Sequence, residues 1–121
     1  MIGIIGIIRR RTMNKKIVDK IIDFRDERDW KQFHTPKNLA ISISLEANEL
    51  LELYQWAEHV DKIDVEEEIA DIAIYLLTFC YDNNINLEEA IEKKIKINAR
   101  NYPVELVKGS SKKHPNDGMY P

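Results

Sequence analysis

The segment from Val65 to Tyr81 is apolar around most of its circumference when it is drawn as a helix, at roughly 100° per residue. A helix that is apolar nearly all round is a buried helix. The sequence therefore predicts that this segment is covered by other helices. The apolar side chains that surround it are Val65, Ile69, Ile72, Ala73, Ile74, Leu76, Leu77, Phe79 and Cys80.

Two carboxylates interrupt this apolar surface and share one face. Glu68 and Asp71 are three residues apart, and Tyr75 follows one turn later. In the preceding helix, Glu46 lies inside an apolar arc and Glu49 lies at the edge of that arc. Ionised carboxylates are costly to bury unless they are paired or bind a metal. We therefore expect these four acids to hold a divalent cation, and all-oxygen ligands favour Mg²⁺, or Mn²⁺, over zinc or copper.

A simpler interpretation is that these acids are solvated, because pairs of glutamates three residues apart are common on exposed helix faces. Glu66, Glu67, Glu88, Glu89 and Glu92 fit that description, or that of first-turn residues which suit the helix dipole. The arcs around the four other acids are otherwise apolar, which favours the metal site.

The four candidate helices are residues 14–29, 36–58, 65–81 and 86–101. Thr35 followed by Pro36 is typical of a helix start, and Asn86 with Glu89 resembles a capping box. The mixed charges of residues 25–29 predict a solvated helix end. No strand pattern or glycine-rich phosphate loop occurs, so we expect an all-α, four- to five-helix bundle. We expect four helices from one chain to be too few to cover such an apolar third helix. We therefore expect homo-oligomerisation to complete the bundle.

At 121 residues, with 44% hydrophobic and 32% charged residues, the composition is ordinary for one soluble domain. A formal net charge of −3 argues against general nucleic-acid binding. The single cysteine, Cys80, suits a reducing cytoplasm and the role of a small core residue. The apolar run within residues 1–13 is too short to span a bilayer, so we expect no membrane contact. We expect residues 1–13 to be an extra N-terminal segment that is disordered or peripheral. Residues 14–107 form the predicted domain, and residues 108–121 a flexible polar tail.

Two tryptophans suggest a base-stacking pocket beside the acids. Trp56 comes seven residues after Glu49, which places it on the same side of a helix and about 10 Å further along. That distance is similar to the separation of phosphates and base in a nucleotide. Trp30 offers a second aromatic face. Core or interface packing of both rings is the alternative.

A second polar group lies near the end of the last predicted helix. Lys94 and Asn98 are four residues apart, with Arg100 and Tyr102 nearby. A lysine, an amide and a phenol are suitable contacts for phosphate oxygens. The same spacing also occurs on an ordinary helix surface, and that alternative stays open.

Together these motifs resemble the all-α nucleotide pyrophosphohydrolases, and within them the MazG-like dCTP pyrophosphatase branch. The resemblance covers residues 14–113 and includes the segment 24–34 and the tail 109–113. The motifs that carry it are E-x-x-E (Glu46, Glu49), E-x-x-D (Glu68, Asp71), K-x-x-x-N (Lys94, Asn98), Tyr102-Pro103 and Tyr54-Gln-Trp56.

The resemblance implies cleavage of a nucleoside triphosphate between its α- and β-phosphates, with dCTP or a related dNTP as substrate. Glu46, Glu49, Glu68 and Asp71 would hold Mg²⁺, and one glutamate, for which we favour Glu49, would activate or orient water. The resemblance further implies a homodimer or homotetramer whose subunits share a site. The remaining implied contacts are Lys94 and Asn98 to phosphates, Tyr75 and Tyr102 lining the pocket, Trp30 and Trp56 around the base, and His34 near it.

Three other functions fit parts of the sequence. A related pyrophosphohydrolase could act on dUTP or phosphoribosyl-ATP. A di-iron carboxylate bundle would need Glu-x-x-His pairs, and neither Glu46 nor Glu68 has a histidine three residues on. A non-catalytic helical dimerisation module would use the acids structurally, and metal-dependent turnover of any dNTP would dispose of it.

Overall fold

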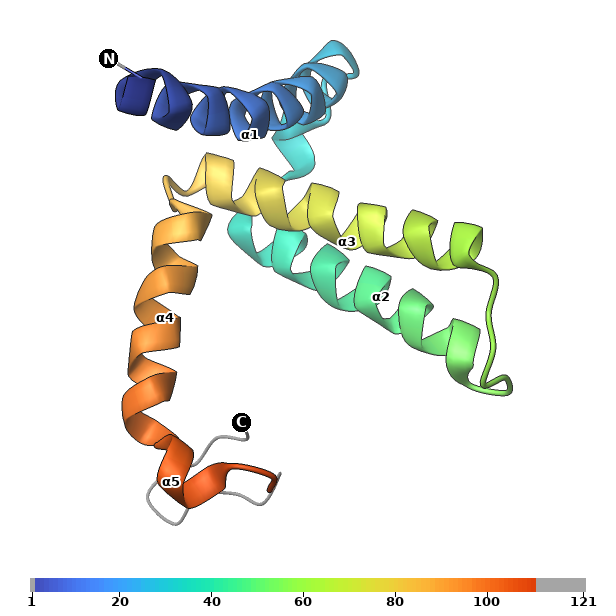
Figure 1. The fold of residues 1–121 in the computed structure, drawn as a ribbon. Helices are drawn as coiled ribbons and strands as arrows, with labels where there is room; N and C mark the ends of the chain where they lie inside the picture. Colours follow the sequence, from blue (N-terminus) through green and yellow to red (C-terminus); the bar gives the residue numbers. More distant parts are fainter. Residues whose placement is uncertain (1, 111–121) are drawn as a thin grey trace. The chain divides into compact units, whose positions relative to one another are not determined.

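The computed structural model describes residues 2–110, with side chains from residue 15 onward, and every regular element in that part of the chain is helical. The all-α prediction is therefore confirmed for the described residues, while completion by homo-oligomerisation stays a prediction. In chain order the elements are α1 (Ile2–Glu27), the 3₁₀ turn η1 (Lys31–Phe33), α2 (Pro36–Tyr54), α3 (Lys62–Asp82), α4 (Leu87–Asn101) and α5 (Val104–Val107) (Figure 1).

Two predicted helix starts are confirmed by their capping bonds. The Thr35 hydroxyl accepts a hydrogen bond from the Asn38 N–H at 3.1 Å, and Pro36 takes the first helical position of α2. The Asn86 side chain accepts from the Glu89 N–H at 3.2 Å at the start of α4. Each bond satisfies a backbone donor that has no partner inside its helix.

Two other boundaries differ from the prediction. α2 ends at Tyr54, short of the predicted residue 58, and the chain bends until α3 begins at Lys62. The Gln55 N–H bonds the Glu52 carbonyl at 3.2 Å, a tightened last turn that closes the helix. α1 begins at Ile2 and not at residue 14. Its first turns include the segment expected to be additional, whose side chains lie outside the description.

The chain divides into two compact units, Met1–Asn84 and Ile85–Pro121. In the first unit α2 and α3 pack side by side, and α1 lies against the C-terminal part of α3 (Figure 1). Among the residues whose side chains the structure describes, few apolar ones are buried: Ile22, Leu39 and Cys80. The predicted core role of Cys80 is therefore confirmed. The predicted division into residues 1–13, 14–107 and 108–121 stays a prediction, and residues 111–121 lie outside the described chain.

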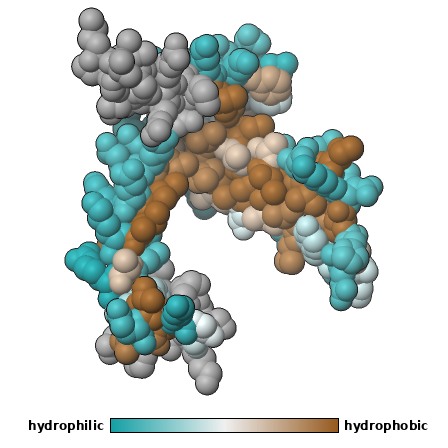
Figure 2. All heavy atoms as spheres, viewed as in Figure 1, coloured by the Kyte–Doolittle hydropathy of each residue, from teal (hydrophilic) through white to brown (hydrophobic). Residues whose placement is uncertain are grey.

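The apolar pattern predicts a buried third helix, and within its own unit α3 is only partly covered, so its burial by a further copy stays a prediction. Among the described residues of its unit, α3 packs mainly on α2 and, over a smaller contact, on α1, and part of its apolar circumference stays exposed within that unit. Figure 2 shows apolar surface over α2 and α3. We call the uncovered apolar side chains of these two helices the exposed apolar face; they include Ile41 (48% exposed), Leu45, Ile63 (70% exposed), Ile69 and Leu76.

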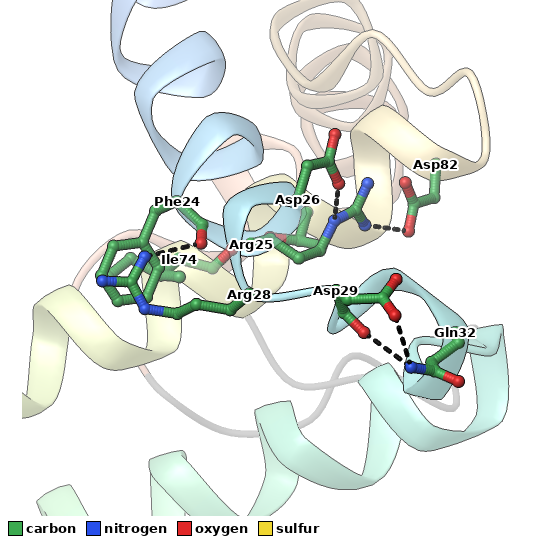
Figure 3. A network of polar contacts seen from close by, with 9 residues as sticks. Phe24, Arg25, Asp26, Arg28, Asp29, Gln32, Ile74 and Asp82 are labelled. Carbon is green, nitrogen blue, oxygen red and sulfur yellow. Dashed lines mark hydrogen bonds and ion pairs between the residues drawn. The ribbon is translucent and has the colours of Figure 1, made fainter.

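The prediction of a solvated end for residues 25–29 is wrong at Arg25, whose side chain is 3% exposed. Its guanidinium donates to Asp82, the last residue of α3, at 2.7 Å and to the neighbouring Asp26 at 3.2 Å (Figure 3). Arg25 follows Ile21 and Ile22 at helical spacing, so it falls on the inner face of α1. Asp82 compensates the charge of Arg25 there.

Among the described residues, no helix is long and apolar enough to cross a membrane.

Candidate metal centre

Four carboxylates from α2 and α3 converge at the middle of this helix pair. Glu46 and Glu49 come from α2, and Glu68 and Asp71 come from α3. Each residue offers one carboxylate oxygen, and these four oxygens all lie within 4.8 Å of one another. The spacing of three residues on each helix turns both acids of a pair toward the facing helix. The structure thus brings together the four residues that the sequence singled out, while their role as metal ligands stays a prediction.

The cluster has a partly buried and an exposed half. Glu46 and Glu68 are partly buried, whereas Glu49 and Asp71 are exposed. One oxygen of Glu46 and one of Glu68, Oε2 in both, are buried and have no hydrogen-bond partner. A buried acceptor without a partner is destabilising, so two such atoms in one cluster favour a site that takes a cation.

The electrostatics of the cluster favour protons on the two inner acids when no cation is bound. Burial raises the pKa of Glu46 above its ordinary value, and the nearby charges of Glu49, Asp71 and Glu68 raise it further. Burial also raises the pKa of Glu68, with Glu49 beside it as the next cause. Both effects disfavour the ionised form. A divalent cation would reverse that preference.

The donor set fits Mg²⁺ or Mn²⁺. The cluster offers carboxylate oxygens alone, which are ligands of hard cations, and it contains neither a thiolate nor an imidazole. The two unpartnered oxygens point to the same conclusion, because each retains its full capacity to accept. Glu46, Glu49, Glu68 and Asp71 would therefore hold the ion.

Tyr75 and His34 lie next to one another in the same unit. Their rings meet edge to face, with centroids 6.4 Å apart. Tyr75 follows Asp71 by one turn of α3, which places it beside the acidic cluster. The Nδ1 atom of His34 is buried without a hydrogen-bond partner. Burial lowers the pKa of His34, and the charge of Arg25 lowers it further. The neutral imidazole is therefore the favoured form near neutral pH.

Trp30 lies in the turn between α1 and η1, where its indole is 45% exposed. It packs edge to face on Phe24, with ring centroids 5.8 Å apart. The guanidinium of Arg28 lies 3.6 Å from the centre of the Phe24 ring (Figure 3). The turn therefore holds Trp30 by one edge and leaves much of its ring accessible.

The predicted helical position of Trp56 is wrong, because α2 ends two residues before it. Trp56 lies in the bend that follows, and its side chain is 90% exposed. That exposure argues against packing in the core of its own unit, and packing at an interface stays the alternative. Its role in base binding stays a prediction.

The three predicted phosphate and pocket contacts belong to the second unit. Lys94 and Asn98 lie on α4, and Tyr102 follows the end of that helix, where its N–H bonds the Asn98 carbonyl at 2.7 Å. All three are within one compact segment, as the sequence predicted, and their contacts with a nucleotide stay predictions.

The residues that sequence reasoning missed are Arg25 and Asp82, whose ion pair joins α1 to α3. The only available signal was the position of Arg25 on the apolar stripe of its helix. No local pattern connects it with a partner 57 residues away.

Comparison with known proteins gives a consistent result. The MazG-like family matches residues 41–116 of this chain. dCTP pyrophosphatase 1 of Homo sapiens is 35% identical over 102 residues, and that of Bos taurus 36%; each alignment covers 76% of this chain and 60% of the relative. The chain thus spans about three fifths of the length of these curated relatives. The crystal structure of a pyrophosphatase from Archaeoglobus fulgidus is 46% identical, with a TM-score of 0.71, and the match covers 75% of this chain and 93% of that one.

Proposed function

The chain belongs to the MazG-like family, and on this premise we propose that it is a Mg²⁺-dependent nucleoside triphosphate pyrophosphohydrolase. Its reaction is the cleavage of a dNTP between the α- and β-phosphates, giving a dNMP and pyrophosphate. The preferred substrate is dCTP or a related dNTP, and the cellular role is housekeeping of the cytoplasmic nucleotide pool. The observation that carries the proposal is the convergence of four carboxylates with two unpartnered buried oxygens.

The chemistry of this reaction requires positioning and neutralisation of charge more than covalent catalysis. When bound, Mg²⁺ supplies a positive charge against the phosphate oxygens and orients them. The chain itself supplies the acids that hold the ion, and an exposed carboxylate, Glu49, which accepts a proton from the attacking water. The oxygen of that water forms the new bond to phosphorus. The bond between that phosphorus and the bridging oxygen breaks, and the products are the dNMP and pyrophosphate.

Base recognition in this proposal uses the aromatic residues outside the acidic cluster. Trp30 and Trp56 are both accessible, and base stacking on such rings is worth about 1–3 kcal/mol for each base. His34 and Tyr75 lie in contact beside α3 and would border the base and sugar. Lys94 and Asn98 would contact phosphates, and Tyr102 would line the pocket.

The proposed assembly is a homodimer or homotetramer. Most large apolar residues of α2 and α3 are not buried in the described part of the chain, and contiguous apolar surface of this kind is typical of interaction sites. Packing of this face against a second copy would bury it and complete the helical bundle, and residues of different subunits would then share one site. Nucleic acids and membranes are not part of the proposal.

The test is pyrophosphate release from a panel of dNTPs and NTPs, measured with Mg²⁺ and with EDTA. We expect Mg²⁺-dependent release, greatest with dCTP, that disappears in a Glu49→Ala variant. Glu52→Ala is a matched control, because Glu52 is an exposed glutamate of the same helix whose side chain accepts a hydrogen bond from Asn48 at 3.2 Å. Equal activity of the Glu49→Ala variant would remove Glu49 from the mechanism. No turnover of any triphosphate by folded protein would contradict the hydrolase and favour a binding or assembly module.

A further inference from the structure

A buried ion pair joins the last turn of α1 to the last residue of α3. Arg25 Nη1 donates to Asp82 Oδ2 at 2.7 Å, with the two side chains 3% and 16% exposed. Arg25 Nε donates in addition to Asp26 at 3.2 Å (Figure 3). Apolar residues of similar size would hold two helices together at least as well. A charged pair fixes direction and register as well as proximity, which indicates a requirement for defined geometry at this contact.

The main chain of Arg25 organises the turn that carries Trp30. Its carbonyl accepts hydrogen bonds from the N–H groups of Arg28 and Trp30, both at 3.2 Å. Between them Asp29 adopts a positive φ of 53°, which ends the helix and reverses the chain. One residue thus anchors its side chain on α3 and its carbonyl on the turn.

The same segment continues through η1 to His34. The rings of His34 and Tyr75 are in contact on the α3 side. Burial lowers the pKa of His34, the charge of Arg25 lowers it further, and the charge of Asp82 raises it. The segment from Arg25 to His34 is therefore attached to α3 near both of its ends, through Asp82 and through Tyr75.

We propose that the Arg25–Asp82 pair is a positioning device that fixes residues 28–34 against α3, the helix that carries Glu68 and Asp71. The pair acts on substrate through Trp30 and His34, so it sets the affinity for the nucleotide and leaves the metal ligands unchanged. The kinetic part of this inference rests on the proposed pyrophosphohydrolase function. The structural part, the fixation of residues 28–34, does not depend on it.

The first experiment measures amide hydrogen exchange in the full chain carrying Asp82→Asn. This variant keeps the shape of the side chain and removes the charge that compensates Arg25. We expect the amides of residues 28–34 to exchange about tenfold faster, while those in the middle of α2 and α3 keep their wild-type rates. Lys62→Gln is the matched control, because it removes an exposed ion pair of the same helix, at 3.6 Å from Glu66, and should change no rate.

The second experiment compares steady-state kinetics of the same proteins. In Asp82→Asn we expect the KM for dCTP to rise about tenfold, with kcat and the half-saturating Mg²⁺ concentration within about twofold of wild type. A residue that only stabilises the fold would instead lower kcat in proportion to the folded fraction and leave the KM unchanged. The Lys62→Gln control should match wild type.

Arg25→Lys provides a variant that keeps the charge pair should Asp82→Asn fail to fold. It loses the bond to Asp26, and we expect a smaller rise in exchange confined to residues 28–34. Wild-type exchange at these residues in a folded variant would overturn the proposal, as would faster exchange spread evenly over the first unit or an unchanged KM in an active enzyme. If the wild-type protein hydrolyses no triphosphate, the proposed function fails, and the exchange pattern alone decides whether the pair fixes this segment.

Discussion

Glu46 on α2 and Glu68 on α3 each keep one buried carboxylate oxygen without a hydrogen-bond partner, inside a cluster whose ligand oxygens lie within 4.8 Å of one another. Buried polar atoms in folded proteins normally have hydrogen-bond partners, and atoms without one are destabilising. The exceptions gather at functional sites. The arrangement links three measurable properties of the protein: its stability without metal, the pH dependence of that stability, and its affinity for divalent cations.

The metal-free protein should lose stability as the pH rises above 4.5. Glu46 and Glu68 hold their protons more tightly in the folded chain than in the unfolded chain, where each glutamate has its ordinary pKa of 4.5. The contribution of these two acids to the free energy of unfolding is therefore complete below pH 4.5. It is lost as the pH rises through their raised pKa values in the folded chain. Thermal unfolding in EDTA across pH 4–8 measures the effect. Addition of Mg²⁺ at pH 7.5 should restore the melting temperature, because the ion binds the folded, ionised cluster. A melting temperature unaffected by Mg²⁺ would contradict the metal site.

Glu46→Gln should separate stability from function. The amide carries no charge, so it removes the repulsion within the cluster, and the metal-free variant should melt at or above the wild-type temperature near pH 7. Activity should fall by more than the roughly 10–100-fold typical for loss of an outer-shell partner. Melting curves measure the predicted stability of the variant, and pyrophosphate-release assays on the same samples measure the predicted loss of activity. A variant with full activity would exclude Glu46 as a ligand.

Trp56→Ala should weaken nucleotide binding without destabilising the chain. The side chain is 90% exposed, so its removal leaves no cavity in the first unit. Loss of one stacked base is worth about 1–3 kcal/mol, which predicts a rise in the KM for dCTP of about 5- to 150-fold. A large fall in the melting temperature with an unchanged KM would instead assign Trp56 to packing between subunits.

Ile41→Lys should disrupt the proposed assembly. Ile41 belongs to the exposed apolar face and is 48% exposed in the single chain, where a charge is tolerated at low cost. At a contact between copies the same charge would be buried, so the variant should sediment as a smaller species than wild type. Asn48→Lys, an exposed polar position on the same helix, is the control. A wild-type particle of 14.2 kDa, the mass of one chain, would refute the assembly.

Local features of this fold could be predicted from sequence because local rules govern them. The capping roles of Thr35 and Asn86 depend on residues three positions away, and both are confirmed. The spacing of the acids within each helix likewise predicted that the two pairs could face each other. Only the structure could bring the pairs to within ligand distance, because their approach depends on the packing of α2 against α3.

The features that could not be predicted depend on distant neighbours. Arg25 resembled a solvated residue in a charged run until Asp82, 57 positions later, supplied its partner. The helical spacing from Glu49 to Trp56 assumed a longer helix, and the tightened turn at Gln55 ends α2 first. The apolar circumference of α3 predicted burial, yet its own unit supplies only two helices to cover it.

The most direct test of the central claim is ³¹P NMR of dCTP incubated with the protein and Mg²⁺. The four-carboxylate site of a pyrophosphohydrolase predicts that the three triphosphate signals are replaced by those of dCMP and pyrophosphate, that EDTA stops the change, and that Glu49→Ala abolishes it. Formation of dCDP and inorganic phosphate, or a triphosphate spectrum that stays unchanged with folded wild-type protein and Mg²⁺, would contradict it.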